Sequence, residues 1–295
     1  MEKIIVIVGA TSSGKTSLSI DLAKRFNGEV ISADSRQVYK GLDLASGKVT
    51  KEEMGAVPHH LLDIADVHEV FSASDFVHHG KKAMRDIFDK GTLPIIAGGT
   101  GFYIDSLLER ISIPQVPPNK ELRMKLENYT LKELQEMLEQ SDPERYSTID
   151  VNNPRRLVRA IEIADALGKN PPLVKKSKYD ILWIGIEVPT EILKEKIRAR
   201  LLERLDAGMI GELEGLHQRG LSYERMEQLG LECRYIARYL QHQLSREEMV
   251  EQLYSEIVKY ARRQKQWFKT NQDIQWFPPG EIKEIHNQVE NFLNR

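Results

Sequence analysis

A glycine-rich run near the start of the chain has the composition of a phosphate-binding loop. Residues 9–16 read Gly-Ala-Thr-Ser-Ser-Gly-Lys-Thr, which fits the pattern G-x-x-x-x-G-K-[ST] in full. In this pattern backbone N–H groups converge on an anion, the lysine supplies a mobile cation, and the last hydroxyl can ligate Mg²⁺. The pattern does not say which phosphate compound binds. The predicted phosphate-binding residues are Gly9, Ala10, Thr11, Ser12, Ser13, Gly14, Lys15 and Thr16, with Thr16 as the candidate metal ligand.

Two further polar segments directly follow apolar, strand-like runs. Asp34 opens the run Asp-Ser-Arg-Gln-Val-Tyr after residues 29–33, and Thr100 lies in the run Gly-Gly-Thr-Gly-Phe-Tyr after residues 93–97. Ligands of open parallel sheets bind beyond the carboxyl ends of the strands. We therefore expect a carboxylate, Asp34, and a hydroxyl, Thr100, beside the bound phosphate. Both residue types also occur as simple turn or cap residues.

The elements that must position these groups alternate between strand and helix. Residues 4–8 form a continuous apolar run rich in β-branched side chains, as expected for a strand buried on both faces. Further strands are predicted at 29–33, 93–97 and 181–187, and helices at 16–26 and 71–90. Such alternation requires crossover connections and a parallel sheet. The predicted fold is α/β, with a parallel sheet core like that of P-loop NTPases and an inserted helical domain.

The insertion is predicted from a change of pattern between residues 111 and 179, where no convincing strand is found. Leucines at helical spacing from Leu122 to Leu138 indicate helices with an apolar stripe. Asn153-Pro154 is typical of a helix start and Gly168 of a helix end. We therefore divide the chain into a P-loop α/β core, residues 1–111 and 180–295, and a helical insertion domain, residues 112–179.

Composition narrows the class of protein. With 295 residues, 41% hydrophobic, the chain is long enough for a large core and a second domain, and its apolar runs are too short to cross a bilayer. A single cysteine, Cys233, excludes an internal disulfide framework and is typical of a reducing compartment, so we expect a cytoplasmic protein. Because the net charge is −2, any attraction to nucleic acid must come from local basic clusters.

Three more motifs accompany those already described. They are Pro-His-His-Leu-Leu-Asp at 58–63, Asn-Asn-Pro-Arg-Arg-Leu-Val-Arg-Ala at 152–160, and Tyr-Ala-Arg-Arg-Gln at 260–264 followed by Trp267-Phe268. Together with the phosphate loop and the runs at 34–39 and 98–103, they resemble the motifs of bacterial tRNA dimethylallyltransferases (tRNA isopentenyltransferases) along nearly the whole chain. The family's R-V-D segment differs here, reading Arg200-Leu201-Leu202.

The resemblance implies transfer of a dimethylallyl group from dimethylallyl diphosphate to the N6 amine of the adenosine 3′ of the anticodon, giving N6-isopentenyladenosine. It implies that Asp34 is the general base and that Thr100 and Arg200 act on the diphosphate, with Mg²⁺ as cofactor. These roles suit the chemistry. The exocyclic amine is a poor nucleophile that a carboxylate can assist, and a departing diphosphate needs cations and donors already in place.

The expected partners are dimethylallyl diphosphate and the anticodon stem-loop of tRNA, with the target base flipped from its stack. We expect no association with membranes and a monomer. The residues expected to contact tRNA, from the resemblance and from the basic clusters, are Asp34, Ser35, Arg36, Gln37, Arg123, Arg155, Arg156, Leu157, Val158, Arg159, Arg262 and Arg263.

Other functions remain open from the residues alone. An isopentenyltransferase acting on free adenine nucleotides would share the chemistry. A small-molecule P-loop kinase would use Lys15 and Thr16 to hold ATP and Asp34 to activate a hydroxyl. A non-catalytic RNA-binding module would have no use for a complete phosphate cradle. The pairs His59-His60 and His78-His79 lack further ligands at suitable spacing, so we interpret them as structural or solvent-exposed residues rather than a metal site.

Overall fold

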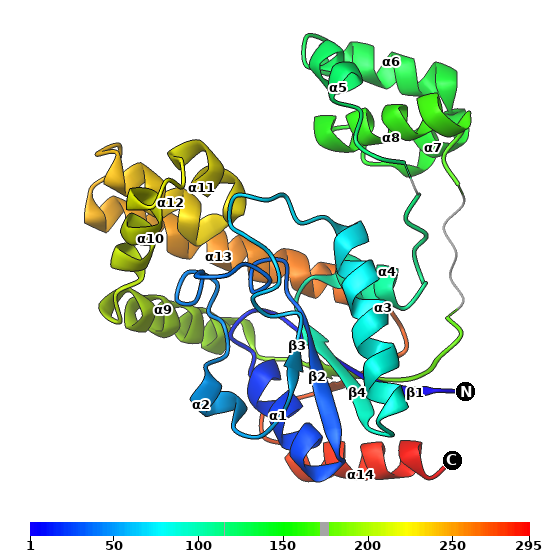
Figure 1. The fold of residues 1–295 in the computed structure, drawn as a ribbon, viewed down its shortest axis with the longest axis vertical. Coiled ribbons are helices and arrows are strands. Elements are labelled where there is room, and N and C mark those ends of the chain that lie inside the picture. Colours follow the sequence, from blue (N-terminus) through cyan, green and yellow to red (C-terminus); the bar gives the residue numbers. More distant parts are fainter. Residues whose placement is uncertain (115, 172–176) are drawn as a thin grey trace. The chain divides into compact units, whose positions relative to one another are not determined.

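The chain divides into two units, each with its own core. The computed structural model describes residues 1–114, 116–171 and 177–295 (Figure 1). Unit 1 comprises Met1–Leu108 and Ser177–Arg295, and unit 2 comprises Glu109–Lys176. The sequence-based division placed the insertion at residues 112–179, and the role of that insertion in binding tRNA stays a prediction.

Unit 1 is built on a six-stranded sheet in the order β3-β2-β4-β1-β5-β6, with every pair of neighbours parallel. The strands are β1 (Lys3–Gly9), β2 (Gly28–Ala33), β3 (His59–His60), β4 (Leu93–Gly98), β5 (Asp180–Ile186) and β6 (Ile274–Phe277). The predicted parallel α/β fold is thereby confirmed. The two edge strands, β3 and β6, were not predicted, because runs this short carry no periodicity.

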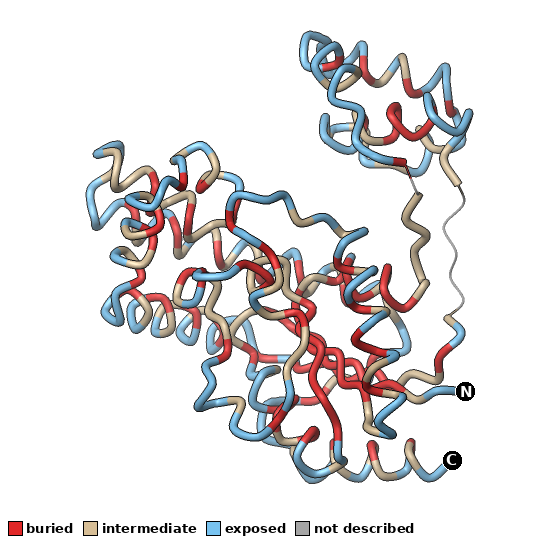
Figure 2. The backbone as a smooth tube through the Cα atoms, in the orientation of Figure 1, coloured by how far each residue is buried: buried red, intermediate tan, exposed pale blue. Residues whose placement is uncertain are grey.

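Helices cover both faces of this sheet. They are α1 (Lys15–Arg25), α2 (Lys51–Met54), α3 (Ala73–Asp89), α4 (Gly101–Leu107), α9 (Thr190–Asp206), α10 (Met209–Gln218), α11 (Tyr223–Leu229), α12 (Leu231–Leu240), α13 (Arg246–Lys269) and α14 (Ile282–Leu293). Alternate side chains of β1 point to opposite faces of the sheet. Ile5 and Ile7 pack with α1, α9 and α14, whereas Val6 and Val8 pack with α3 and α4. The central strands β1, β2 and β4 are therefore buried over nearly their whole length (Figure 2).

The first strand also holds the last helix. Lys3 Nζ donates to the carbonyl oxygens of Phe292 and Leu293 at 2.9 Å each, which are among the unpaired carbonyls at the end of α14. Val289 and Phe292 of this helix are buried in the same core as Ile5. Helix α14 and strand β1 thus pack together, although they lie at opposite ends of the sequence given.

Unit 2 is helical in its described residues. Its helices are α5 (Lys120–Leu126), α6 (Leu131–Ser141), α7 (Pro143–Thr148) and α8 (Pro154–Leu167). Helix α8 begins as predicted, since the Asn153 side chain accepts a hydrogen bond from Arg156 N and Pro154 takes the first turn. The core of the unit comprises Leu126, Leu134, Leu138, Leu157, Ala160 and Ile161. Among the helices described in either unit, none has the length and apolar character needed to span a membrane.

Candidate active site

The ends of three neighbouring strands bring the predicted site together. In the order β2-β4-β1, Gly98 pairs with Ala33 on one side and with Val8 on the other, so the three strands end level. The loops that follow are bonded to one another. Thr100 N donates to Ala33 O at 3.2 Å, and Ser35 N donates to Thr100 Oγ1 at 3.2 Å. Asp34 and Thr100 therefore lie beside the phosphate loop at one edge of the sheet.

The loop at residues 9–16 connects β1 to α1. Gly14 takes the left-handed conformation (φ 98°) immediately before α1, where a residue with a side chain would be strained. Lys15 Nζ donates to Ala10 O at 2.6 Å. Burial lowers the pKa of Lys15 to about 8, the charge of Asp34 opposes this shift, and that of Arg200 adds to it. The structure thus places Lys15, Asp34 and Arg200 within one electrostatic environment.

The Asp34 carboxylate is held from one side only. Its Oδ1 accepts hydrogen bonds from Arg36 N at 2.8 Å and Gln37 N at 3.4 Å, as in a turn capped by an aspartate side chain. Its Oδ2 accepts no hydrogen bond from the residues that the structure describes. One oxygen therefore orients the side chain while the other can take a proton from a substrate.

Thr100 makes a second contact that the sequence did not predict. The hydroxyl of Tyr260, on α13, hydrogen bonds with the Thr100 side chain, and burial together with the charge of Asp34 raises the pKa of Tyr260 to about 12. Tyr260 is therefore protonated at neutral pH and can donate. The Thr100 hydroxyl accepts from Ser35 N, and because a hydroxyl can donate as well as accept, it can also hydrogen bond with an anion.

Arg200 reaches the site from α9. Its Nη2 donates to Gly47 O at 3.0 Å, and a side chain at Gly47 would collide with it, since an added Cβ would lie 2.7 Å from Nη2. Burial and the neighbouring Arg204 lower the pKa of Arg200. Arg204 donates to Leu44 O at 2.5 Å and Ala45 O at 2.6 Å, so the two arginines pack against one loop.

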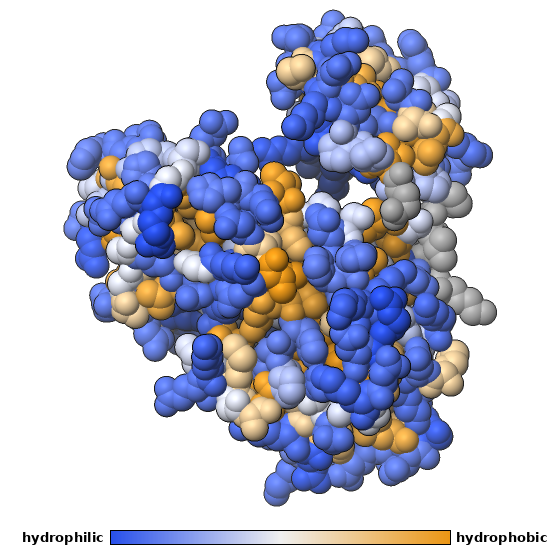
Figure 3. Space-filling view, in the orientation of Figure 1, coloured by the Kyte–Doolittle hydropathy of each residue, from blue (hydrophilic) through white to orange (hydrophobic). Residues whose placement is uncertain are grey.

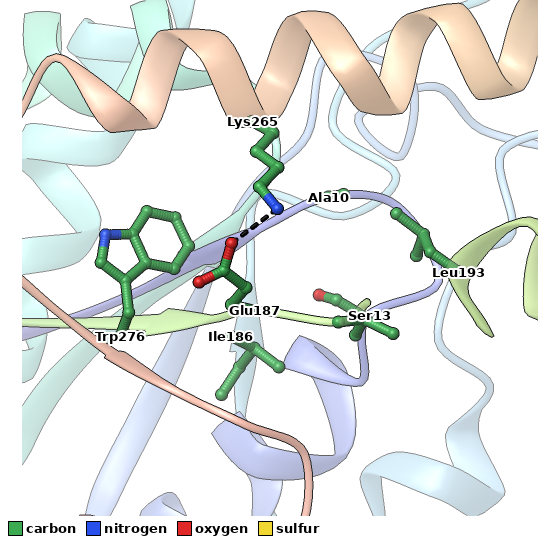
Figure 4. Close-up of a pocket in the computed structure, with 8 residues that line it drawn as sticks. Ala10, Ser13, Ile186, Glu187, Leu193, Lys265 and Trp276 are labelled. Atoms are coloured by element: carbon green, nitrogen blue, oxygen red, sulfur yellow. Dashed lines mark ion pairs between the residues drawn. The ribbon is translucent and has the colours of Figure 1, made fainter. Parts of the chain in front are cut away.

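A small cavity lies under the phosphate loop (Figure 4). It has a volume of about 10 Å³, enough for about one water molecule. Ser13 lines it and is 2% exposed, and the Ser13 hydroxyl has no hydrogen-bond partner in the part of the chain described. Beside it, Lys265 of α13 forms an ion pair with Glu187 at 2.5 Å. The cavity is too small for an organic substrate.

The RNA-contacting residues predicted in unit 1 occupy different environments. The Gln37 side chain bonds within the protein, accepting from Ser32 Oγ at 3.0 Å and donating to Gly47 O at 3.3 Å. Arg36 Nη1 donates to Gln228 O at 3.3 Å. Arg262 and Arg263 are exposed on α13. The exposed arginines are thus open to a ligand, whereas the Gln37 side chain supports the loop.

In unit 2 the predicted RNA contacts separate into side chains that pack or pair with Glu162 and side chains that are exposed. Arg123 donates to the buried Glu162 carboxylate at 2.9 and 2.8 Å, and Arg159 also pairs with Glu162. Arg155 and Arg156 are exposed. Leu157 is fully buried in the core of the unit, so its side chain packs there, and the expected contact of the 155–159 segment with tRNA stays a prediction. The apolar face of α8 requires Leu157 for packing. Val158 also packs against this core.

Removing the Glu162 charge should destabilise unit 2. The side chain is 1% exposed, and hydrogen bonds from Arg123 and Arg159 outweigh burial and lower the pKa of Glu162 to about 2. A carboxyl whose pKa is lowered on folding stabilises the protein above its unfolded pKa, and this contribution disappears as the pH falls through the folded value. Glu162→Gln should therefore reduce the free energy of unfolding at neutral pH by roughly 2–3 kcal/mol. The difference should vanish between about pH 4.5 and pH 2.

Urea unfolding followed by hydrogen exchange in α8 measures this effect. Glu136→Gln is the matched control, because the Glu136 carboxylate is 56% exposed and pairs only loosely with Lys132, at 3.7 Å. Equal stability of the two variants at neutral pH would contradict the assignment.

Both histidines of the first pair, His59 and His60, have hydrogen-bond partners within the protein. His60 Nε2 bonds with Glu29 Oε2 at 2.7 Å, and His59 Nδ1 with Val57 O at 2.9 Å. In the described residues there is no cluster of three or more His, Cys, Asp or Glu side chains that could hold a metal ion.

The phosphate loop after the first strand of a parallel sheet, with charged groups at the neighbouring strand ends, defines a P-loop protein of the α/β class. Residues 37–271 match the family model described as IPP transferase. The chain belongs to this family of transferases.

Its relatives extend over nearly the whole chain. It is 48% identical over 271 residues to tRNA dimethylallyltransferase 2 of Treponema denticola, covering 90% of this chain and 91% of the relative. It is 40% identical over 299 residues to tRNA dimethylallyltransferase of Anoxybacillus flavithermus, covering 99% and 96%.

Two solved structures are similar to this one. The crystal structure of the full-length tRNA isopentenylpyrophosphate transferase from Bacillus halodurans has a TM-score of 0.77 and 34% identity, covering 100% of this chain and 97% of that chain. A eukaryotic dimethylallyltransferase acting on tRNA has a TM-score of 0.83 and 27% identity, covering 94% and 74%.

Proposed function

We propose that this protein transfers a dimethylallyl group from dimethylallyl diphosphate to the N6 amine of the adenosine 3′ of the anticodon in tRNA. The observation that carries the proposal is the shared environment of Lys15, Asp34 and Arg200 beside Thr100, at the level ends of three strands. This site combines a phosphate cradle with a carboxylate, that of Asp34, of which one oxygen accepts no hydrogen bond from the described residues. The names of the relatives support the choice of substrates.

Different residues act on the amine that attacks and on the diphosphate that leaves. As the amine nitrogen bonds to the allylic carbon, the bond from that carbon to the diphosphate oxygen breaks, and the diphosphate leaves with the electron pair. Asp34 Oδ2 takes the proton that the amine loses. Lys15 and Arg200 oppose the growing negative charge of the diphosphate, and the Thr100 hydroxyl donates to it. Burial strengthens these interactions, because water screens them less.

Mg²⁺ fits the donors present. The Thr16 hydroxyl is exposed in the first turn of α1, directly after the phosphate loop. Mg²⁺ typically keeps several waters and binds through one or two protein oxygens plus substrate phosphates. Thr16 and the diphosphate would therefore hold it, and the ion would help to neutralise the diphosphate charge.

The test is incubation with labelled dimethylallyl diphosphate, Mg²⁺ and either unmodified tRNA or an anticodon stem-loop, with AMP and ATP as competing acceptors. Label transferred to the RNA supports the proposal. Efficient labelling of AMP without labelling of the stem-loop would instead identify a free-nucleotide isopentenyltransferase. Consumption of ATP with phosphoryl transfer to a small molecule would identify a kinase.

We propose that the exposed arginines of α8 bind the phosphate backbone of tRNA. Hydrophilic side chains dominate the face of unit 2 shown in Figure 3, and Arg155 and Arg156 are exposed. Arg159 is committed to Glu162 and is unsuitable for a clean test. With a net charge of −2 for the whole chain, such local cations must supply the attraction.

Neutralising both arginines, as Arg155→Gln with Arg156→Gln, should weaken tRNA binding about tenfold at physiological salt. The slope of log affinity against log salt should fall by roughly 1–2. Affinity for dimethylallyl diphosphate should not change. Lys125→Gln with Lys132→Gln removes the same charge from exposed positions of unit 2 and serves as the control. An unaltered salt slope in the arginine variant would place the RNA contacts elsewhere.

A further inference from the structure

One face of α13 holds the loops that carry the site. Tyr260, Gln264 and Trp267 follow one another at helical spacing, so they share a face. Tyr260 bonds with Thr100, and Trp267 Nε1 donates to Asp105 Oδ2 at 2.9 Å. Gln264, between them, is 6% exposed and cannot reach solvent or a large ligand.

The Gln264 amide connects two loops that are far apart in sequence. Its Oε1 accepts from Thr11 N, in the phosphate loop, at 2.8 Å. Its Nε2 donates to Gly99 O, next to Thr100, at 3.0 Å. An amide side chain offers an acceptor and a donor in one rigid plane, which an aliphatic or carboxylate side chain does not. Beyond the paired ends of β1 and β4, this amide therefore links the phosphate loop directly to the Thr100 loop.

The glycines on either side of Thr100, Gly99 and Gly101, pack tightly against α13. A Cβ added to Gly99 would lie 2.0 Å from Gln264 Nε2, and one added to Gly101 would lie 2.2 Å from Trp267 Cδ1. Both distances are far below normal contact. The backbone on each side of Thr100 is thus packed directly against α13, so a change in Gln264 would be transmitted to Thr100.

We propose that Gln264 is a positioning residue for prenyl transfer. It holds the loop that cradles the diphosphate at the right distance from the hydroxyl of Thr100, which donates to the same diphosphate. This inference rests on the proposed function. Because a misplacement of about 1 Å can cost about 10²-fold in rate, loss of this link should reduce the chemical step without affecting RNA binding.

The first test replaces the amide by an apolar side chain of similar length. Gln264→Met should slow single-turnover transfer by about 10–100-fold, with the Kd for tRNA unchanged within about twofold. Gln266→Met makes the same change at an exposed position of the same helix and should behave as the unaltered protein. A single-turnover rate of Gln264→Met within twofold of this control would overturn the inference.

The second test separates positioning from a general packing role. In Gln264→Glu the protonated carboxyl can accept from Thr11 N and donate to Gly99 O, whereas the ionised carboxylate can only accept. Burial raises the pKa of the introduced carboxyl, and the group is protonated below that pKa. The rate relative to the unaltered protein should therefore rise as the pH falls from about 8 to about 5. A ratio independent of pH would overturn the inference, and this test holds if Gln264→Met fails to fold.

Failure of the proposed function would be recognised separately, as an unaltered protein that transfers no dimethylallyl group to RNA. The hydrogen bond from Thr11 N to Gln264 would then be tested by hydrogen exchange of the Thr11 amide. Exchange should be at least about tenfold faster in Gln264→Met than in Gln266→Met, because the amide loses its acceptor. Equal exchange in the two variants would overturn the inference.

Discussion

Replacement of Asp34 by asparagine should slow single-turnover prenyl transfer by about 10²–10⁴-fold. The amide keeps the shape of the side chain and an oxygen that can accept from Arg36 N, so the turn should persist. It has no basic oxygen to take the proton of the adenine amine. Rapid mixing of enzyme, labelled dimethylallyl diphosphate and tRNA measures the step directly. Binding of dimethylallyl diphosphate should change little.

A control variant separates the two roles of Asp34, as the cap of a turn and as the general base. Asp66 forms the same kind of local bond, its Oδ1 accepting from His68 N at 2.9 Å, at an exposed position. Asp66→Asn should therefore leave the rate unchanged. If Asp34→Asn also transferred the group at a near-normal rate, Asp34 would be a turn residue and another group would be the base.

Removing either cation should slow departure of the diphosphate by about 10²–10³-fold, as Lys15→Met or Arg200→Met. Both charges lie in the environment of Asp34 and act on one anion. The double variant should therefore lose less than the product of the single losses. Single-turnover rates of the two single variants and the double variant form the cycle that measures this coupling.

Two comparisons make this second experiment decisive. Lys24→Met removes a lysine from an exposed position of α1 and should have no effect on the rate. Thr100→Ala should cost less than either cation, because a neutral donor stabilises an anion less than a charged one. A normal rate for Arg200→Met would show that the match at Arg200-Leu201-Leu202 was misinterpreted.

The edge of the sheet where the site lies could be predicted because each strand-like run is mainly apolar and is followed directly by a polar or glycine-rich segment. The patterns after residues 8, 33 and 97 are therefore sufficient to indicate the phosphate loop, Asp34 and Thr100. The order β2-β4-β1, which makes these ends neighbours, depends on crossover connections that no local pattern encodes. Arg200 was found only through the resemblance, since an arginine on a long charged helix has no local signature.

Contacts made across long sequence separations could not be predicted. Tyr260 and Gln264 belong to a motif identified in the sequence, but the residues that Gln264 contacts lie 165 and 253 positions earlier in the chain. In unit 2, Arg159 and Glu162 are spaced like an exposed ion pair on a helix surface. Only the packing of the unit shows that Glu162 is buried and shared with Arg123. Burial of a charge is a tertiary property that spacing does not encode.

The placement of β1 has a consequence for folding during synthesis. The first strand pairs with β4 and β5 and packs against α14, whose carbonyls bind Lys3, so one of its partners is synthesised 289 residues after it. Unit 2 is continuous in sequence and rich in local helical contacts, which favour fast folding. We therefore expect the inserted unit to fold on the nascent chain while unit 1, and with it the packing around β1, stays incomplete until α14 has been synthesised.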